Sequence, residues 1–198
     1  MSENPNESAA GSPVTGLFSA VDLAVSTLAA VAPDQYDNAT PCPDYSVRDL
    51  CNHVVSVVRR VGVLGAGGEF FSVPHFAEDT ADGEWSAAAQ IAAKDLKAAW
   101  SDPGVLGRQV ALPWGPVPGA AAAVIYTNEL VLHTWDIAKG TSQRPEFDPA
   151  MLAAPLANMK RAVPAENRGG PVPFGPVVEV PDDAPAIDRL VGWYGRRP

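Results

Sequence analysis

Apolar residues recur every three or four positions along four stretches of the chain, and this is the spacing of one buried face of an α-helix. The stretches cover residues 13–32, 47–64, 85–100 and 119–139. The connections between them contain proline, glycine and aspartate, which end helices and form turns. Four long helices with short or medium connections predict an all-α fold, an up-down-up-down four-helix bundle.

The second of these stretches has the clearest beginning. Ser46 is a typical N-cap residue, and Asp49 follows three positions later, as in a capping box. Leu50 and Val57 belong to the apolar face of this helix, and His53 lies between them at helical spacing. We therefore expect the His53 side chain to point into the bundle.

The third stretch is rich in alanine, and we expect Ile91, Leu96 and Trp100 on its inner face. Residues 1–12 are polar and predict a flexible N-terminal arm. The remainder, 13–198, shows no internal repeat and no second core, so we expect a single domain.

The C-terminal part predicts an irregular extension packed along the outside of the bundle. A cap followed by proline at 148–149 opens a short helix to about residue 162, which Pro155 should kink or shorten. Residues 168–181 are rich in proline and glycine and should be extended, and 184–194 can form a last short helix.

Composition narrows the possible partners. The chain has 198 residues, a net charge of −9 and a pI near 4.7, which argues against nucleic acid and anionic membranes as partners. It contains no run of 18 apolar residues, and its beginning lacks the layout of a signal peptide. We therefore expect a cytoplasmic protein in which Cys42 and Cys51 are reduced thiols.

The candidate chemistry lies on the fourth helix. Glu129, His133 and Asp136 are spaced to form one stripe on that helix, at the border of its apolar face. Burying these groups together is costly unless a cation compensates them. With His53 from the second helix, two histidines and one carboxylate could hold a divalent metal and leave a coordination position open, as in catalytic zinc sites. The same set also suits iron(II) or nickel.

Simpler interpretations remain open at this point. A glutamate four residues before a histidine also fits a hydrogen-bonded pair on a helix, and a core histidine often bonds a carbonyl. His75, in a loop beside Pro74, is expected to be exposed, and Cys51 is expected to pack in the core. No nucleophile elbow, dinucleotide fingerprint or phosphate loop occurs. Three aromatic residues in the loop 65–83 suggest a lid, namely Phe70, Phe71 and Phe76.

The segment 40–50, TPCPDYSVRDL, followed by His53, resembles the entry to the second helix in the DinB-like metal-binding superfamily. Within it, the segment is similar to the branch containing the N-terminal domain of mycothiol-dependent maleylpyruvate isomerase. The stretch 129–136 resembles the helix-four motif of that branch, and the tail from Phe174-Gly175-Pro176 to Gly195-Arg196 resembles a subgroup of single-domain metal-binding proteins.

This resemblance implies a four-helix bundle that holds a divalent metal, often Zn²⁺ and alternatively Ni²⁺ or Fe²⁺. The implied ligands are His53, Glu129 and His133. The resemblance also implies a small-molecule thiol such as mycothiol as partner, together with an electrophilic small-molecule substrate. Asp136 becomes the candidate catalytic group, which takes the thiol proton or holds an imidazole ligand in one tautomer.

One departure limits the resemblance, because the isomerase continues into a second domain and here 58 residues follow Gly140. We therefore expect a metal-dependent thiol transferase or isomerase, as a monomer or homodimer, rather than maleylpyruvate isomerisation itself. The alternative is a non-catalytic metal-binding or structural bundle. A fourth protein ligand, for example Asp136, would favour that alternative.

Overall fold

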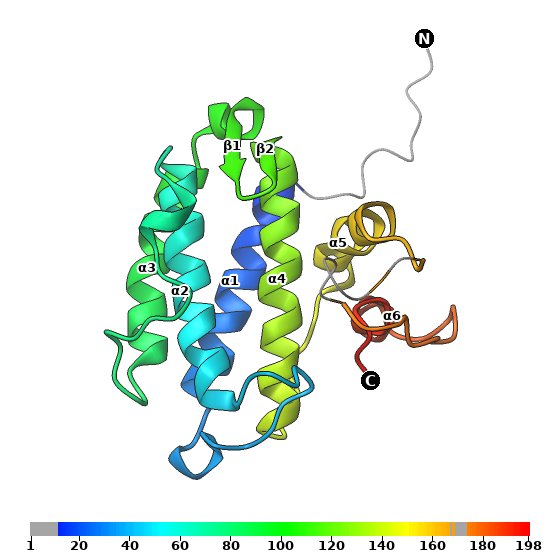
Figure 1. The fold of residues 1–198 in the computed structure, drawn as a ribbon. Helices are drawn as coiled ribbons and strands as arrows, with labels where there is room; N and C mark the ends of the chain where they lie inside the picture. The colour runs from blue at the N-terminus through cyan, green and yellow to red at the C-terminus, as the bar shows by residue number, and fades with distance from the viewer. Residues whose placement is uncertain (1–11, 167, 169–173) are drawn as a thin grey trace.

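The computed structural model describes residues 12–166, 168 and 174–198, and these form a bundle of four helices with two shorter helices beside it (Figure 1). The bundle helices are α1 (Pro13–Ala29), α2 (Val47–Gly65), α3 (Trp85–Trp100) and α4 (Gly119–Gly140). The predicted all-α fold is confirmed. All but residue 12 of the expected N-terminal arm lies outside the described residues.

The directions of the helices differ from the predicted strict alternation. Near the start of both α2 and α3, Trp85 Nε1 donates a hydrogen bond to Asn52 Oδ1 at 3.0 Å. Near the end of both, Trp100 Nε1 donates to the Val61 carbonyl at 2.8 Å. The two helices therefore run parallel, because the long connection 66–84 returns along α2 before α3 begins (Figure 1).

The beginning of α2 follows from its cap. The Asp49 N–H donates to Ser46 Oγ at 3.3 Å, and the Ser46 N–H donates back to Asp49 Oδ2 at 2.9 Å. This reciprocal pair satisfies two backbone donors that the first helical turn leaves free. It confirms the predicted capping box and fixes the rotation at which α2 presents His53.

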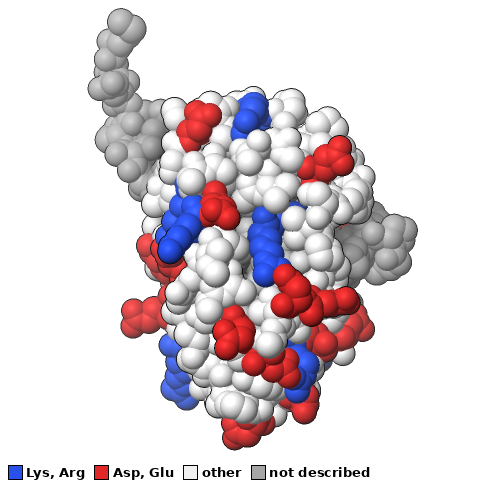
Figure 2. Space-filling view, turned by 90° about the vertical axis from the view of Figure 1, so that its left-hand side faces the viewer, with Lys and Arg blue, Asp and Glu red and all other residues white. Residues whose placement is uncertain are grey.

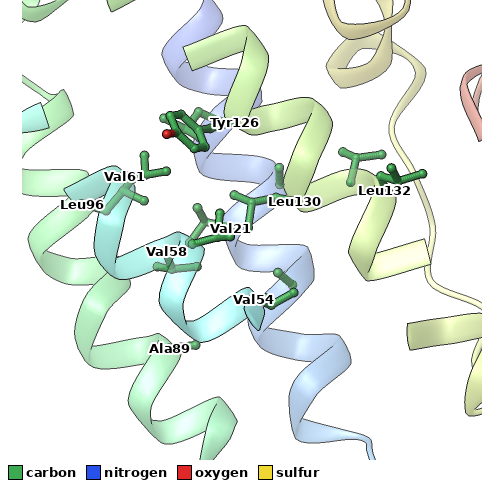
Figure 3. Close-up of a cluster of buried hydrophobic side chains, with 14 of the residues drawn as sticks. Val21, Val54, Val58, Val61, Ala89, Leu96, Tyr126, Leu130 and Leu132 are labelled. Carbon is green, nitrogen blue, oxygen red and sulfur yellow. The ribbon is translucent and has the colours of Figure 1, made fainter. Parts of the chain in front are cut away.

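The core lies between the four bundle helices (Figure 3), where Val21, Val58 and Leu130 are at most 1% exposed. In α3, Leu96 and Trp100 are buried as expected, but Ile91 is 66% exposed, so its predicted inward position is wrong. The buried stripe of α3 consists instead largely of alanines and tryptophans at helical spacing, namely Trp85, Ala89, Ala92, Ala93, Leu96 and Trp100.

A short antiparallel hairpin precedes α4. Its strands are β1 (Gln109–Leu112) and β2 (Gly115–Pro118), which pair antiparallel. After α4 the chain forms α5 (Pro149–Ala162) and α6 (Ala186–Trp193). Helix α5 continues past Pro155, so the expected shortening does not occur.

The surface agrees with the acidic composition. On the face that Figure 2 shows, acidic side chains gather towards the lower end and basic ones are interspersed among them. Acidic residues of the connection before α3 are exposed, namely Glu78, Asp79, Asp82 and Glu84. Among the described residues, none of the helices combines the length and the hydropathy that a membrane span requires.

Candidate metal centre

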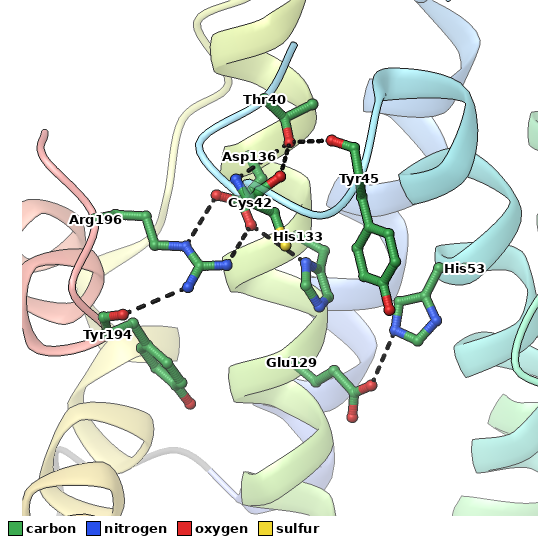
Figure 4. A network of polar contacts seen from close by, with 9 residues as sticks. All are labelled: Thr40, Cys42, Tyr45, His53, Glu129, His133, Asp136, Tyr194 and Arg196. Atoms are coloured by element: carbon green, nitrogen blue, oxygen red, sulfur yellow. Dashed lines mark hydrogen bonds and ion pairs between the residues drawn. The ribbon is translucent and has the colours of Figure 1, made fainter. Parts of the chain in front are cut away.

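Three of the predicted site residues converge between α2 and α4 (Figure 4). His53, Glu129 and His133 each offer one ligand atom, and these atoms lie within 4.8 Å of one another. His53 Nε2 is 3.3 Å from Glu129 Oε1. The two imidazole rings have centroids 5.1 Å apart and are nearly perpendicular, at 87°. The structure thus brings together the set that the sequence singled out; its role as a metal site stays a prediction.

A backbone carbonyl orients the His53 ring. His53 Nδ1 lies 3.0 Å from the His75 carbonyl oxygen. Because a carbonyl can only accept, Nδ1 carries a proton and donates it. The other nitrogen, Nε2, therefore faces Glu129 as the side of the ring available to a cation.

A carboxylate and an arginine orient the second imidazole. His133 Nδ1 lies 3.2 Å from Asp136 Oδ2, which fixes Nδ1 as the donor and leaves Nε2 for the shared site. Asp136 is 0% exposed. Its two oxygens accept hydrogen bonds from Arg196 Nε at 3.2 Å and Arg196 Nη2 at 3.0 Å (Figure 4). The tail thus supplies the counter-ion of Asp136, a role that no local sequence pattern predicts for Arg196.

Cys42 lies beside His133 and Asp136. One ligand atom each of Cys42, His133 and Asp136 also lies within 4.8 Å of the others. The guanidinium of Arg196 already neutralises Asp136, so this second group is a poorer place for a cation than the first. Burial raises the pKa of the Cys42 thiol, which keeps it protonated and unreactive near neutral pH.

The electrostatics of Glu129 favour its charged form. Burial acts to raise the pKa of this carboxyl, but a doubly protonated His53 donates a hydrogen bond from Nε2–H to Glu129 and opposes that effect. The charges of the protonated His53 and His133, and that of Arg60, add to the opposition, and the pKa of Glu129 lies below its ordinary value. An ionised Glu129 is the form that a metal requires.

Part of the loop before α3 covers one side of the centre. The Phe76 ring meets the His53 ring edge-on at 6.0 Å, and Tyr45 Oη lies 3.0 Å from His75 Nε2. Phe71 is 80% exposed, so of the three aromatic residues expected to form a lid, this one does not cover the centre. His75 is exposed as predicted, while the contact of its carbonyl with His53 was not foreseen.

The lowered pKa of Glu129 predicts how the metal-free protein responds to acid. A carboxyl with a depressed pKa in the folded state contributes stability above its ordinary value of 4.5 and loses that contribution as the pH falls through the folded value. In urea unfolding of the metal-free protein between pH 3 and 6, the free energy of unfolding should therefore decrease as the pH is lowered. Glu129→Gln should make this dependence shallower. Identical pH profiles for the two proteins would contradict the assignment.

Known proteins resemble this chain in sequence and in fold. Residues 18–138 match the family described as the mycothiol maleylpyruvate isomerase N-terminal domain. An uncharacterized protein of Mycobacterium tuberculosis, Rv0738 in strain H37Rv, is 32% identical over 177 residues, covering 89% of this chain and 93% of that protein. Its counterpart in strain CDC 1551 matches with the same values.

A solved structure shares the fold. It is the crystal structure of a histidine-to-alanine mutant of mycothiol-dependent maleylpyruvate isomerase, which superimposes with a TM-score of 0.56. The match covers 75% of this chain and 68% of that chain, at 11% sequence identity. At this identity the similarity shows a common fold.

Proposed function

Because the chain belongs to the family of the mycothiol maleylpyruvate isomerase N-terminal domain, we propose that it binds a divalent metal and activates a small-molecule thiol. His53, Glu129 and His133 are the proposed ligands, and zinc is the proposed metal. The observation that carries the proposal is the 3.3 Å separation of His53 Nε2 and Glu129 Oε1.

This separation is informative because of what the two atoms are. In the neutral imidazole the one ring proton is on Nδ1, where the His75 carbonyl accepts it, so Nε2 presents a lone pair. Glu129 Oε1 also presents lone pairs. Two such atoms repel at this distance unless a proton or a metal cation lies between them. His133 supplies a third potential ligand atom to the same space.

The residues around the ligands fit a site that a small molecule can reach. The Glu129 side chain is 30% exposed, whereas the His53 side chain is 4% exposed. A bound divalent cation would act as a Lewis acid and lower the pKa of a coordinated thiol. The mycothiol dependence of the solved relative makes mycothiol the first thiol to test.

Asp136 supports the ligands rather than reacting. Both of its oxygens accept hydrogen bonds from Arg196, and one also accepts from His133. It is fully buried. Of the two roles expected from the sequence, this arrangement favours holding the His133 imidazole in one tautomer over taking a proton from a thiol. It also argues against Asp136 as a fourth ligand, and hence against a closed, structural metal site.

Cobalt substitution tests thiol activation. A thiol that binds cobalt(II) through sulfur should produce a charge-transfer band in the near ultraviolet when millimolar mycothiol or cysteine is added between pH 6 and 9. The Cys42→Ala variant is the matched control, since the band must persist when the nearby protein thiol is absent. A cobalt spectrum that no thiol changes would leave the non-catalytic alternative as the better account.

A further inference from the structure

A cavity of about 450 Å³ lies where the end of α4, the connection after it and α6 meet. Its apolar lining includes Trp135 of α4, Phe147 of the connection and Ile187 of α6. Trp135 follows His133 by two residues, which is about 200° of rotation around the helix axis. The cavity and the candidate metal centre therefore lie on different sides of α4.

The indole N–H of Trp135 is an unmatched donor at this cavity. Other indole N–H groups each donate to an acceptor of the protein, namely those of Trp85, Trp100 and Trp193. Trp135 is only 4% exposed, yet among the described residues its N–H has no acceptor. Its nitrogen is not one of the fully buried unpaired atoms of the described chain, so it is reachable from the cavity that Trp135 lines. A largely buried indole N–H usually has a partner, and a ligand acceptor in the cavity would supply it.

Two cations border the same cavity, and none of its lining residues is acidic. Lys139 Nζ lies 5.0 Å from the centre of the Trp135 ring. Arg144 is exposed on the connection. Among the described residues, neither cation has a carboxylate within ion-pair distance. Although the whole chain carries a net charge of −9, this cavity favours an anion.

The turn that ends α4 forms one wall of the cavity. The Ser142 N–H donates to the Lys139 carbonyl at 3.4 Å, and the Gln143 N–H donates to the Ala138 carbonyl at 2.8 Å. These two bonds form a Schellman motif, and Ser142, with φ 58°, occupies the left-handed position that glycine usually takes. The motif reverses the chain, so the connection lines the same cavity as the last turn of α4.

We propose that this cavity binds a small carboxylic acid with an apolar body. The carboxylate is held between the Lys139 ammonium and the Arg144 guanidinium, and one of its oxygens accepts from the Trp135 indole N–H. The apolar body packs against Phe147 and Ile187, which are both half-buried. The apolar contacts supply most of the affinity, and the polar groups fix the orientation of the ligand. The site uses no metal and is independent of the proposed function.

Hexanoate is a suitable probe, with 1-hexanol as its neutral counterpart and acetate as its truncated one. Binding to the metal-free protein is followed by the NMR shift of the Trp135 indole N–H resonance, which is assigned by its absence in Trp135→Phe. Hexanoate should shift this resonance saturably at millimolar concentrations. Hexanol lacks the charge and acetate lacks the apolar body, so both should bind at least about 10-fold more weakly. If either bound as tightly as hexanoate, the proposed ligand class would be wrong.

The two cations are tested by substitution. Lys139→Met and Arg144→Met should each weaken hexanoate binding about 3- to 5-fold, and the double variant about 10-fold or more, since each change removes one exposed ionic contact. Both side chains are exposed, so the variants should fold normally. Lys160→Met is the matched control, because Lys160 Nζ lies 5.3 Å from the ring centre of a different tryptophan, Trp193. A double variant that binds hexanoate as tightly as wild type would overturn the anion site.

Trp135→Phe tests the indole N–H separately. Since the indole resonance is lost in this variant, binding is measured by the rise of the thermal unfolding midpoint with hexanoate concentration. The variant keeps an aromatic ring in the cavity but lacks the donor, so hexanoate should bind several-fold more weakly than to wild type. Equal affinity for the two proteins would contradict the assignment of this donor to the ligand.

Comparing metal-free and zinc-loaded protein separates the cavity from the candidate metal centre. Hexanoate binding to the metal-free protein that depends on Lys139 and Arg144 supports the cavity even if the protein retains no metal. Binding that appears only with zinc, and equally in wild type and the double variant, places the carboxylate on the metal. That outcome would overturn the cavity as the binding site and leave the proposed function standing.

Discussion

His53→Ala should abolish tight zinc binding. The change removes one of three potential ligand atoms that lie within 4.8 Å of one another, and two remaining ligands seldom hold zinc against water. Loss of an outer partner of a metal ligand already weakens binding about 10- to 100-fold, so loss of the ligand itself should exceed about 100-fold. Elemental analysis of protein purified without added metal, followed by competition with a zinc-sensitive chelator, measures the effect.

His75→Ala is the matched control for this experiment. It removes a histidine ring close to His53 but keeps the backbone carbonyl that orients His53. Zinc affinity should therefore stay within a few-fold of wild type. If the two variants lose zinc equally, or if wild-type protein retains none and a chelator leaves its melting midpoint unchanged, the proposed ligand set is wrong.

The helices could be predicted because their signals are local. The cap of α2 consists of Ser46 and Asp49, three residues apart, and the apolar period of each bundle helix covers several turns. The stripe of α3 was harder to orient. Alanine packs on either face of a helix, so the large residue Ile91 was assigned inward, whereas the alanines at 89, 92 and 93 make the contact.

Helix direction could not be read from periodicity. A 3.6-residue pattern is the same whichever way a helix runs, and the connection 66–84 is long enough to return along α2. The hydrogen bonds that hold this return segment involve backbone carbonyls of Val73, Pro74 and His75. Backbone acceptors have no sequence signature, because every residue type carries one.

In the candidate site, too, the contacts between residues close in the sequence could be predicted and the long-range ones could not. Glu129 and His133 are four residues apart on one helix, so the sequence placed them together, and the apolar face of the second helix added His53. Arg196 lies 60 residues from Asp136 in the chain, and nothing in the local sequence links them. Arg60 is 4% exposed, which its sequence does not suggest, because a single arginine in a helix is normally a surface residue.

Removing Arg196 should cause the largest loss of stability among changes to the polar side chains of the site. Asp136 is fully buried, and the Arg196 side chain is 11% exposed, so solvent cannot replace the guanidinium. Deleting one partner of a buried ion pair typically costs about 3–5 kcal/mol. For Arg196→Met we expect about 3 kcal/mol, at the lower end of this range, because His133 still donates a hydrogen bond to Asp136.

Urea unfolding of the metal-free protein measures this effect, with Lys97→Met as the control. Lys97 pairs with Asp22 at 2.6 Å on the surface, and an exposed pair of this kind contributes at most about 1 kcal/mol. The double variant Asp136→Asn/Arg196→Met should recover part of the loss, because a neutral amide needs no counter-ion. If Arg196→Met unfolds as easily as Lys97→Met, the tail does not stabilise Asp136. The His133 imidazole would then owe its orientation to Asp136 alone, and zinc affinity should be the same with and without Arg196.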